Sequence, residues 1–360
     1  MSLFPKVHID LDKIQRNAKT IVDIAERSGI KVFGVTKATT GDPKVGKAMI
    51  DGGVTGLADS RISNIKRLKS HLPAVSCMLL RTPMFSEIAE VIRFADCSIN
   101  TELAILKALA SEATKQCKTH EIILMAELGE RREGILNEEF QDIISCVQKE
   151  KSLQLRGIAM NLTCFSGVIP TEQKLNDFLK LVDQLESNFD VKFEIISGGN
   201  TANIPRLIYH PHTSKINQLR VGEGILLGRE TIQRTAIEHT FQDAFILEAE
   251  LIEVKKKPSV PDGIITENAF GEKKLFEDKG LMIRGIAAIG MQDVIIDDLS
   301  PCDSTVSIIG GSSDHLILEL PNETYTVGDT VRFIPKYGAL VHLFTSPYVM
   351  KTYEHSRVLS

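Results

Sequence analysis

A single lysine stands at the end of a short apolar run, where it could do chemistry. The run is KVFGVT (31–36), and Lys37 follows it, ahead of the polar residues ATTGD. Lysine is rarely fully buried without a partner. In partly dry surroundings the pKa of its ammonium group falls, and the free amine becomes a base or a nucleophile toward carbonyl compounds. The alternative is a solvated lysine just past a strand.

Groups that can bind an anion follow several other apolar runs. The run at 193–199 ends in the turn ISGGNT, whose backbone N–H groups could cradle a phosphate. The polar residues after or near the ends of these runs are Arg131, Arg132, Asn161, Thr163, Asn200, Thr201 and Arg220. Each is weak evidence alone, because Gly-Gly turns and paired arginines are common. Together with a nucleophilic lysine they would form a site for pyridoxal 5'-phosphate (PLP).

The elements that must gather these residues are short strands alternating with helices. Strands are predicted near 31–36, 53–58, 74–80, 94–100, 121–128, 154–162, 193–199 and 218–224, and a helix is predicted from Asp12, its N-cap, to Gly29. Strands that are apolar throughout, each followed by a helix, are typical of a parallel sheet. Eight such units predict a closed (β/α)8 TIM-type barrel, whose active sites lie at the carboxyl ends of the strands. A doubly wound open sheet is the alternative.

The pattern changes after about residue 238. The runs FILEAELIEV, LMIRGIAAIG, STVSIIGG, DHLILEL and YTVGDTVRFI are short, partly alternating and broken by Gly, Pro and Asp. They predict a mostly antiparallel C-terminal β domain. We therefore expect a PLP-binding barrel over 1–238, with residues 1–10 able to pair with the β domain, and the β domain over 239–360.

Composition excludes several classes of protein. The 360 residues are 43% hydrophobic and 25% charged, with a net charge of −5, which gives no electrostatic case for nucleic acid. We expect no membrane helix, since no apolar run approaches the ~18 residues that one needs. The N-terminus lacks an apolar signal core. The six cysteines have no metal-like spacing, so we expect reduced thiols in the cytoplasm and no metal.

Five motifs, in order, resemble those of the alanine racemase family of PLP enzymes. They are VHIDLDKIQRNAKTI, VTKA, the Arg-x-Gly at 132–134, GGNT and RVGEGILLG. The resemblance spans nearly the whole chain and is strongest to the ornithine racemase branch. It implies an amino-acid racemase that interconverts L- and D-enantiomers by removing the Cα proton from an aldimine. It also implies a homodimer in which each β domain completes the partner's site.

The resemblance assigns roles to particular residues. Lys37 matches the lysine that forms the Schiff base and acts as the base on one face of Cα. Around the cofactor ring, Arg132 matches the arginine near the phenolic oxygen, Asn161 stands where the family usually has a histidine, and Arg220 matches the arginine facing the pyridine nitrogen. The residues that match the phosphate site are Asn200, Thr201, Gly222, the Glu223 backbone and Tyr337. Ser313 and Asp314 of GGSSDH match a segment that faces the partner's substrate.

The sequence departs from the family at the second base. Met291 of AIGMQDV stands where the family has a tyrosine, and methionine cannot exchange a proton. The candidate replacements are His315, Tyr337 and Cys164, and His315 is preferred because its segment faces the substrate in the family. A structural histidine is the alternative.

The substrate side chain is the other open question. Asp59, Asp293 and Asp314 are candidates for holding a cationic side chain, although each could pair locally instead. Together with the resemblance they favour ornithine or another basic amino acid over alanine or serine.

Three further classes remain as alternatives. A non-catalytic PLP-binding protein would normally lack the C-terminal β domain. A decarboxylase of this architecture would carry a cysteine motif that SPCDST, with Cys302, does not match. A metal-assisted dehydratase or aldolase would need a cysteine beside the histidine that LVHLF supplies as His342.

Overall fold

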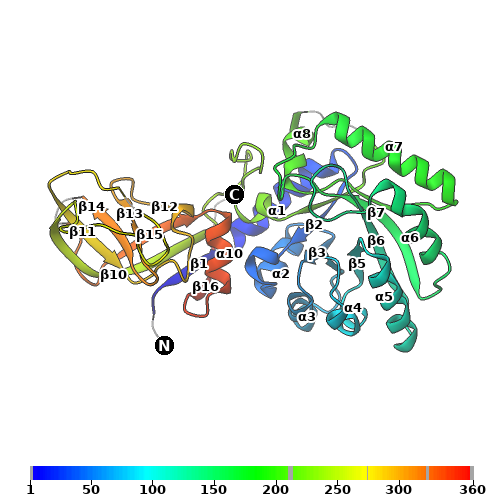
Figure 1. Cartoon of the computed structure of the whole chain (residues 1–360), viewed down its shortest axis with the longest axis horizontal. Coiled ribbons are helices and arrows are strands. Elements are labelled where there is room, and N and C mark those ends of the chain that lie inside the picture. Colours follow the sequence, from blue (N-terminus) through cyan, green and yellow to red (C-terminus); the bar gives the residue numbers. More distant parts are fainter. Residues whose placement is uncertain (1–2, 210–213, 274, 322–323, 357–360) are drawn as a thin grey trace. The chain divides into compact units, whose positions relative to one another are not determined.

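The chain folds into two compact units, shown in Figure 1. The computed structural model describes residues 3–209, 214–273, 275–321 and 324–356. One unit is formed by Leu11–Gln242. The other combines the N-terminal strand β1 (Lys6–Asp10) with residues 243–355. Each unit is described by itself below.

The first unit is a closed barrel of eight parallel strands, as the apolar runs predicted. The strands are β2 (Lys31–Val35), β3 (Gly56–Asp59), β4 (Cys77–Leu79), β5 (Cys97–Asn100), β6 (His120–Ala126), β7 (Leu153–Met160), β8 (Ile195–Ser197) and β9 (Gln218–Val221). Each overlaps the run predicted for it, and closure rules out the open doubly wound sheet. The barrel interior is packed with small and medium apolar side chains, among them Val35, Ala58, Met78, Ile123 and Ala159.

Helices separate the strands and cover the outside of the barrel (Figure 1). They are α1 (Leu11–Glu26), α2 (Pro43–Asp51), α3 (Ile62–His71), α4 (Ile88–Phe94), α5 (Leu103–Lys115), α6 (Phe140–Val147), α7 (Glu172–Phe189), α8 (Ile204–Tyr209) and the short α9 (Glu223–Leu226). The predicted N-cap Asp12 is wrong, because α1 begins at Leu11 and Asp12 lies inside its first turn. Gly29, at φ +68°, follows the helix and provides the expected stop.

The second unit is a largely antiparallel eight-stranded sheet, which confirms the predicted β domain. Its strands are β10 (Phe245–Pro258), β11 (Leu281–Ala287), β12 (Leu299–Pro301), β13 (Ser307–Gly311), β14 (Leu316–Leu320), β15 (Thr330–Pro335) and β16 (Met350–Glu354), together with β1. Strand β1 pairs antiparallel with β10 and parallel with β16. The runs did not predict β12, β16 or the helix α10 (Tyr337–Thr345).

No helix within the described ranges is long and apolar enough to cross a membrane. The six cysteines are free thiols, and the described residues contain no cluster of His, Cys, Asp and Glu side chains that could hold a metal ion.

One buried histidine makes the stability of the barrel depend on pH. His120 begins β6, is 2% exposed, and its Nε2 lies 2.8 Å from the Ser98 hydroxyl. Burial lowers the pKa of His120 from 6.5 to about 4. Between these values the unfolded chain binds a proton at this position and the folded chain does not, so acid favours unfolding.

We therefore expect the free energy of unfolding to fall by roughly 3 kcal/mol between pH 6.5 and pH 4 because of this group. Urea unfolding of wild type and His120→Gln at several pH values measures it. The variant should show a shallower fall over this window, whereas His71→Gln, at an exposed histidine, should match wild type. Equal slopes for wild type and His120→Gln would contradict the assignment.

Candidate active site

The main chain before Lys37 is held by the neighbouring strand. The Thr36 N–H donates to the Ala58 carbonyl over 3.0 Å, and the Thr36 hydroxyl donates to Asp59 Oδ2 over 2.8 Å. Lys37 then begins a short 3-10 helix, η1 (Lys37–Thr39). Its side chain is exposed, so the single chain does not provide the partly dry surroundings that we expected from the sequence. The hydrogen bonds at the strand end therefore fix the backbone position next to Lys37 and leave its amine accessible.

Asp59 is part of the scaffold for this strand end. The side chain is fully buried and also accepts hydrogen bonds from the Arg61 N–H and from Asn64 Nδ2, each over 3.0 Å. Burial raises the pKa of Asp59, and these hydrogen bonds oppose the rise. With its oxygens occupied inside the fold, Asp59 cannot reach a substrate, so this candidate for binding a cationic side chain is wrong.

Asp293 is also unavailable. It is 4% exposed and accepts a hydrogen bond from the Ser346 hydroxyl over 2.6 Å. Of the three carboxylates considered from the sequence, Asp314 is the one that remains exposed.

Arg220 places a buried cation at the edge of the barrel. Strand β9 closes the barrel against β2, with Phe33 opposite Arg220. The Arg220 side chain donates to the Met160 carbonyl over 2.8 Å and to the Ser197 hydroxyl, which are neutral partners. Burial lowers the pKa of Arg220 to about 10. The guanidinium therefore stays charged at neutral pH in a site of low polarity, which is typical of functional positions.

Asn200 links the ends of β7 and β8. Its Oδ1 accepts the Ala202 N–H over 2.9 Å and so caps the 3-10 helix η4 (Thr201–Asn203). Its Nδ2 donates to the Leu162 carbonyl over 2.8 Å and to Asn161 Oδ1 over 3.2 Å. Asn161 Nδ2 is buried and has no hydrogen-bond partner among the described residues. Such a donor costs free energy unless a ligand or a water molecule accepts from it.

Next to Asn161 and Asn200, the start of α9 approaches η4 closely. Thr201 is buried, and its hydroxyl accepts the Gly224 N–H over 3.3 Å. A Cβ atom at Gly222 would lie 3.2 Å from Val35 Cβ and 3.3 Å from the Val35 carbonyl, so glycine permits the approach. The Glu223 side chain pairs with Arg234 over 2.6 Å, which leaves the Glu223 backbone as the part that can face a ligand. The start of α9 thus lies against η4.

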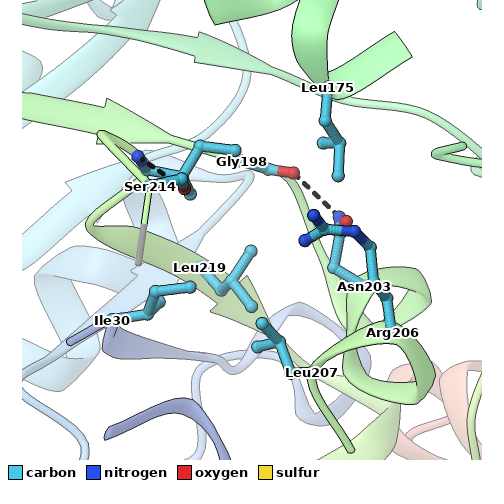
Figure 2. Close-up of a pocket in the computed structure, with 9 residues that line it drawn as sticks. Ile30, Leu175, Gly198, Asn203, Arg206, Leu207, Ser214 and Leu219 are labelled. Atoms are coloured by element: carbon cyan, nitrogen blue, oxygen red, sulfur yellow. Dashed lines mark hydrogen bonds between the residues drawn. The ribbon is translucent and has the colours of Figure 1, made fainter. Parts of the chain in front are cut away.

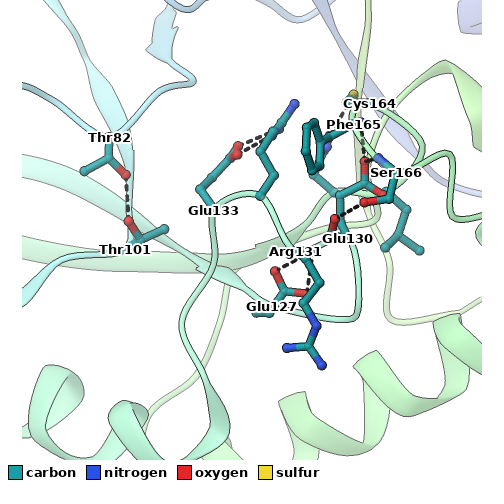
Figure 3. Close-up of polar contacts among 12 residues, drawn as sticks. Thr82, Thr101, Glu127, Glu130, Arg131, Glu133, Cys164, Phe165 and Ser166 are labelled. Atoms are coloured by element: carbon teal, nitrogen blue, oxygen red, sulfur yellow. Dashed lines mark hydrogen bonds and ion pairs between the residues drawn. The ribbon is translucent and has the colours of Figure 1, made fainter.

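The turn after β6 carries Arg132, and Figure 3 shows the neighbouring Glu130, Arg131 and Glu133. Arg132 Nη2 donates to Glu133 Oε1 over 2.5 Å, and Nε also pairs with this carboxylate. The neighbouring Glu130 is 2% exposed and accepts the N–H groups of Thr163 and Ser166 over 3.0 and 3.1 Å. Glu130 therefore fixes the loop after β7 to the loop after β6.

The residues assigned from the β domain lie in the other unit. The Ser313 hydroxyl donates to Asp314 Oδ1 over 3.0 Å, and His315 Nδ1 lies 3.0 Å from the same oxygen. Met291 donates its N–H to the Ser312 carbonyl over 2.9 Å. The segment that lacks the family's tyrosine is therefore adjacent to the GGSSDH segment. Tyr337 begins α10 and is partly buried.

A small cavity lies among residues of α7, α8, β9 and the turn after β8 (Figure 2). It is lined by Leu175, Gly198, Asn203, Arg206 and Leu219, among others, and its volume is about 10 Å³. That is room for about one water molecule and too little for an amino acid.

Comparison with known proteins shows the family to which the chain belongs. Residues 9–230 match the family model described as "Alanine racemase, N-terminal domain". The chain is 40% identical over 352 residues to the ornithine racemase of Acetoanaerobium sticklandii, covering 97% of this chain and 99% of that protein. It is 37% identical over 355 residues to the lysine racemase of Thermotoga maritima, covering 98% and 99%. The chain belongs to the alanine racemase family, and these full-length relatives are amino-acid racemases.

Solved structures show the same fold at low sequence identity. The alanine racemase of E. faecalis matches with a TM-score of 0.73 and 18% identity over 97% of this chain and 98% of that chain. The alanine racemase of Streptomyces lavendulae matches with a TM-score of 0.77 and 16% identity over 99% and 98%. The resemblance inferred from the five motifs is therefore confirmed at the level of family and fold, and the individual residue roles stay predictions.

Sequence reasoning missed the residues that hold the site together. The contact of Asp59 with Thr36 and the contacts of Glu130 join loops that are distant in sequence, and no local pattern announces them. Glu133 is the middle residue of Arg-x-Gly, and the motif itself assigns it no role.

The support of Lys37 can be tested through Thr36. Thr36→Val removes the hydroxyl that donates to Asp59 and leaves a buried oxygen with one donor fewer. We expect a loss of about 1–3 kcal/mol in the free energy of unfolding, measured by urea denaturation. Thr119→Val, at an exposed threonine before β6, is the control and should change stability little. A Thr36→Val protein as stable as wild type would show that the contact contributes nothing.

Proposed function

We propose that the protein is a PLP-dependent racemase of ornithine or another basic amino acid. The main support is the full-length similarity to an ornithine racemase and a lysine racemase, in a chain that keeps Lys37 and a buried Arg220 at the barrel's strand ends. Alanine and serine remain less favoured substrates. The six free thiols agree with a reducing compartment, the cytoplasm.

The residues present suit a phosphorylated aldehyde. Asn161 offers a buried N–H without a partner among the described residues, Arg220 is a buried cation, and a Cβ atom at Gly222 would be tight against Val35. The residues that would hold PLP are Lys37, Arg132, Asn161, Asn200, Thr201, Arg220, Gly222, the Glu223 backbone and Tyr337. When bound, PLP withdraws electrons from Cα of the substrate and makes its proton acidic.

Arg220 would set the protonation of the cofactor's ring nitrogen. A guanidinium facing that nitrogen disfavours a second positive charge, because like charges repel strongly where water is excluded. The hydrogen-bond partners of Arg220 are neutral, so no carboxylate is bonded directly to its guanidinium group in the described residues. The ring is then a weaker electron sink, which favours return of a proton to Cα over transamination.

Two proton-exchanging groups are needed, one on each face of Cα. Lys37 would serve one face. His315 is our first choice for the other, with Tyr337 and Cys164 as alternatives, since Met291 cannot exchange a proton. An Nδ1–H donated to Asp314 would fix the tautomer of His315 whose Nε2 is free of a proton, as a base requires.

The second group would come from a second copy of the chain. In the family, the β domain completes the partner's site, so we propose a homodimer about a two-fold axis in which Ser313, Asp314 and His315 face the partner's barrel. Such an axis repeats the contact identically at both sites.

Lys37 should carry the cofactor. Protein incubated with PLP should turn yellow, and borohydride should make the link to Lys37 permanent, so that the peptide containing Lys37 gains the mass of the reduced cofactor. Lys37→Ala should lose the adduct and at least about 10²-fold to 10⁴-fold in turnover. Lys31→Ala, at the other end of the same strand, should keep both. A permanent link at another lysine would contradict the assignment.

Racemisation should be measured directly on single enantiomers of ornithine, lysine, arginine, alanine and serine in deuterium oxide. We expect loss of optical rotation with one deuterium gained at Cα and no carbon dioxide, fastest for the basic amino acids. A yellow protein that leaves all five unchanged would instead favour a cofactor carrier.

A further inference from the structure

We propose that Glu133 binds the distal ammonium group of the substrate and so selects a diamino acid over a neutral one. This inference rests on the proposed function and names a substrate-binding residue in the barrel. Asp59 and Asp293 are excluded by burial and by their local hydrogen bonds. A cationic side chain entering a site of low polarity needs a carboxylate with free capacity.

Glu133 lies in a turn with a fixed base. The Ile135 N–H donates to the Met125 carbonyl over 2.7 Å, and the Glu127 N–H donates to the Ile135 carbonyl over 3.0 Å. A Cβ atom at Gly134 would lie 2.6 Å from Glu127 Cα, so the two sides of the turn touch beside Glu133. The backbone from which Glu133 projects is therefore well defined at the carboxyl end of β6.

The three carboxylates of this turn differ in what they bind. Glu127 accepts the N–H groups of Gly129 and Arg131, and Glu130 accepts N–H groups of the loop after β7. The described part of the chain gives Glu133 a different kind of partner, the Arg132 side chain. Its side chain is 30% exposed. Figure 3 shows Glu127 and Glu133 on opposite sides of the turn. Glu133 is thus the carboxylate whose partner can exchange without breaking the backbone.

Charge balance gives Glu133 its selectivity. Glu133 pairs directly with Arg132. Burial lowers the pKa of Arg220, and the charges of Cys164 and Glu133 oppose this while that of Arg132 adds to it, so Glu133 also interacts with Arg220. If Arg132 turns to the phenolic oxygen of PLP, as the family resemblance implies, Glu133 loses the cation with which it is directly paired. A diamino acid replaces that cation with its own ammonium group. A neutral amino acid leaves the carboxylate uncompensated, which disfavours its binding.

Binding to the apo-protein tests the proposal without turnover. The probes are two stable conjugates in which the reduced cofactor is joined to the α-amino group of ornithine or of norvaline, which has the same carbon chain without the distal amine. Wild type should bind the ornithine conjugate at least 10-fold more tightly. Glu133→Gln should abolish that ratio, Glu133→Asp should retain part of it, and Glu138→Gln, at an exposed carboxylate nearby, should retain all of it.

The other outcomes overturn the proposal in distinguishable ways. If Glu133→Gln weakens both conjugates equally, the residue positions Arg132 and does not bind the side chain. If Asp314→Asn abolishes the ratio and Glu133→Gln does not, the selecting carboxylate is in the β domain. If wild type binds neither conjugate, the PLP function itself fails. Thermal unfolding of each variant establishes that it is folded.

Discussion

The hydrogen bonding of β2 to β9 is the constraint on which the site depends. These strands are the first and last of the barrel, and their pairing places Gly34 beside Val221. Lys37 and Gly222 then leave neighbouring strands at the same edge, although 185 residues separate them along the chain. Parallel strands all end on one face, so each loop of the barrel contributes there. Without closure, Lys37 and Gly222 would not follow neighbouring strand ends.

Buried polar groups then determine how the loops at this edge are held. Asp59 fixes the end of β2 through Thr36, and Glu130 fixes the loop after β7 to the turn after β6. Neither carboxylate has a cation as its hydrogen-bonding partner in these contacts. Each is instead surrounded by donors from backbone, hydroxyl or amide groups, which suits a carboxylate that must stay in one place. Arg220 is the counterpart with the opposite charge, held by a hydroxyl and a carbonyl.

Much of this architecture was predictable from sequence, for physical reasons. Barrel strands are buried on both faces, so they read as unbroken apolar runs, and all eight were found. Glycines such as Gly222 indicate close backbone contacts, and here a Cβ atom would be tight against Val35. Strand β12, with three residues, is too short to show a pattern. The burial of Asp59 could not be predicted, because a sequence does not distinguish a carboxylate that binds substrate from one that is buried against Asn64.

The departure from the family at the second base lies in the β domain, at Met291. The barrel keeps Lys37 and the Gly-rich segments, although Asn161 stands where the family usually has a histidine. Met291 and the segment that contains His315 are adjacent in the β domain through the hydrogen bond from Met291 to Ser312. A change of proton donor could therefore occur within one small cluster without disturbing the barrel. If the roles proposed for Lys37 and His315 hold, the two proton-exchanging groups belong to separate folding units, and one can change without altering the support of the other.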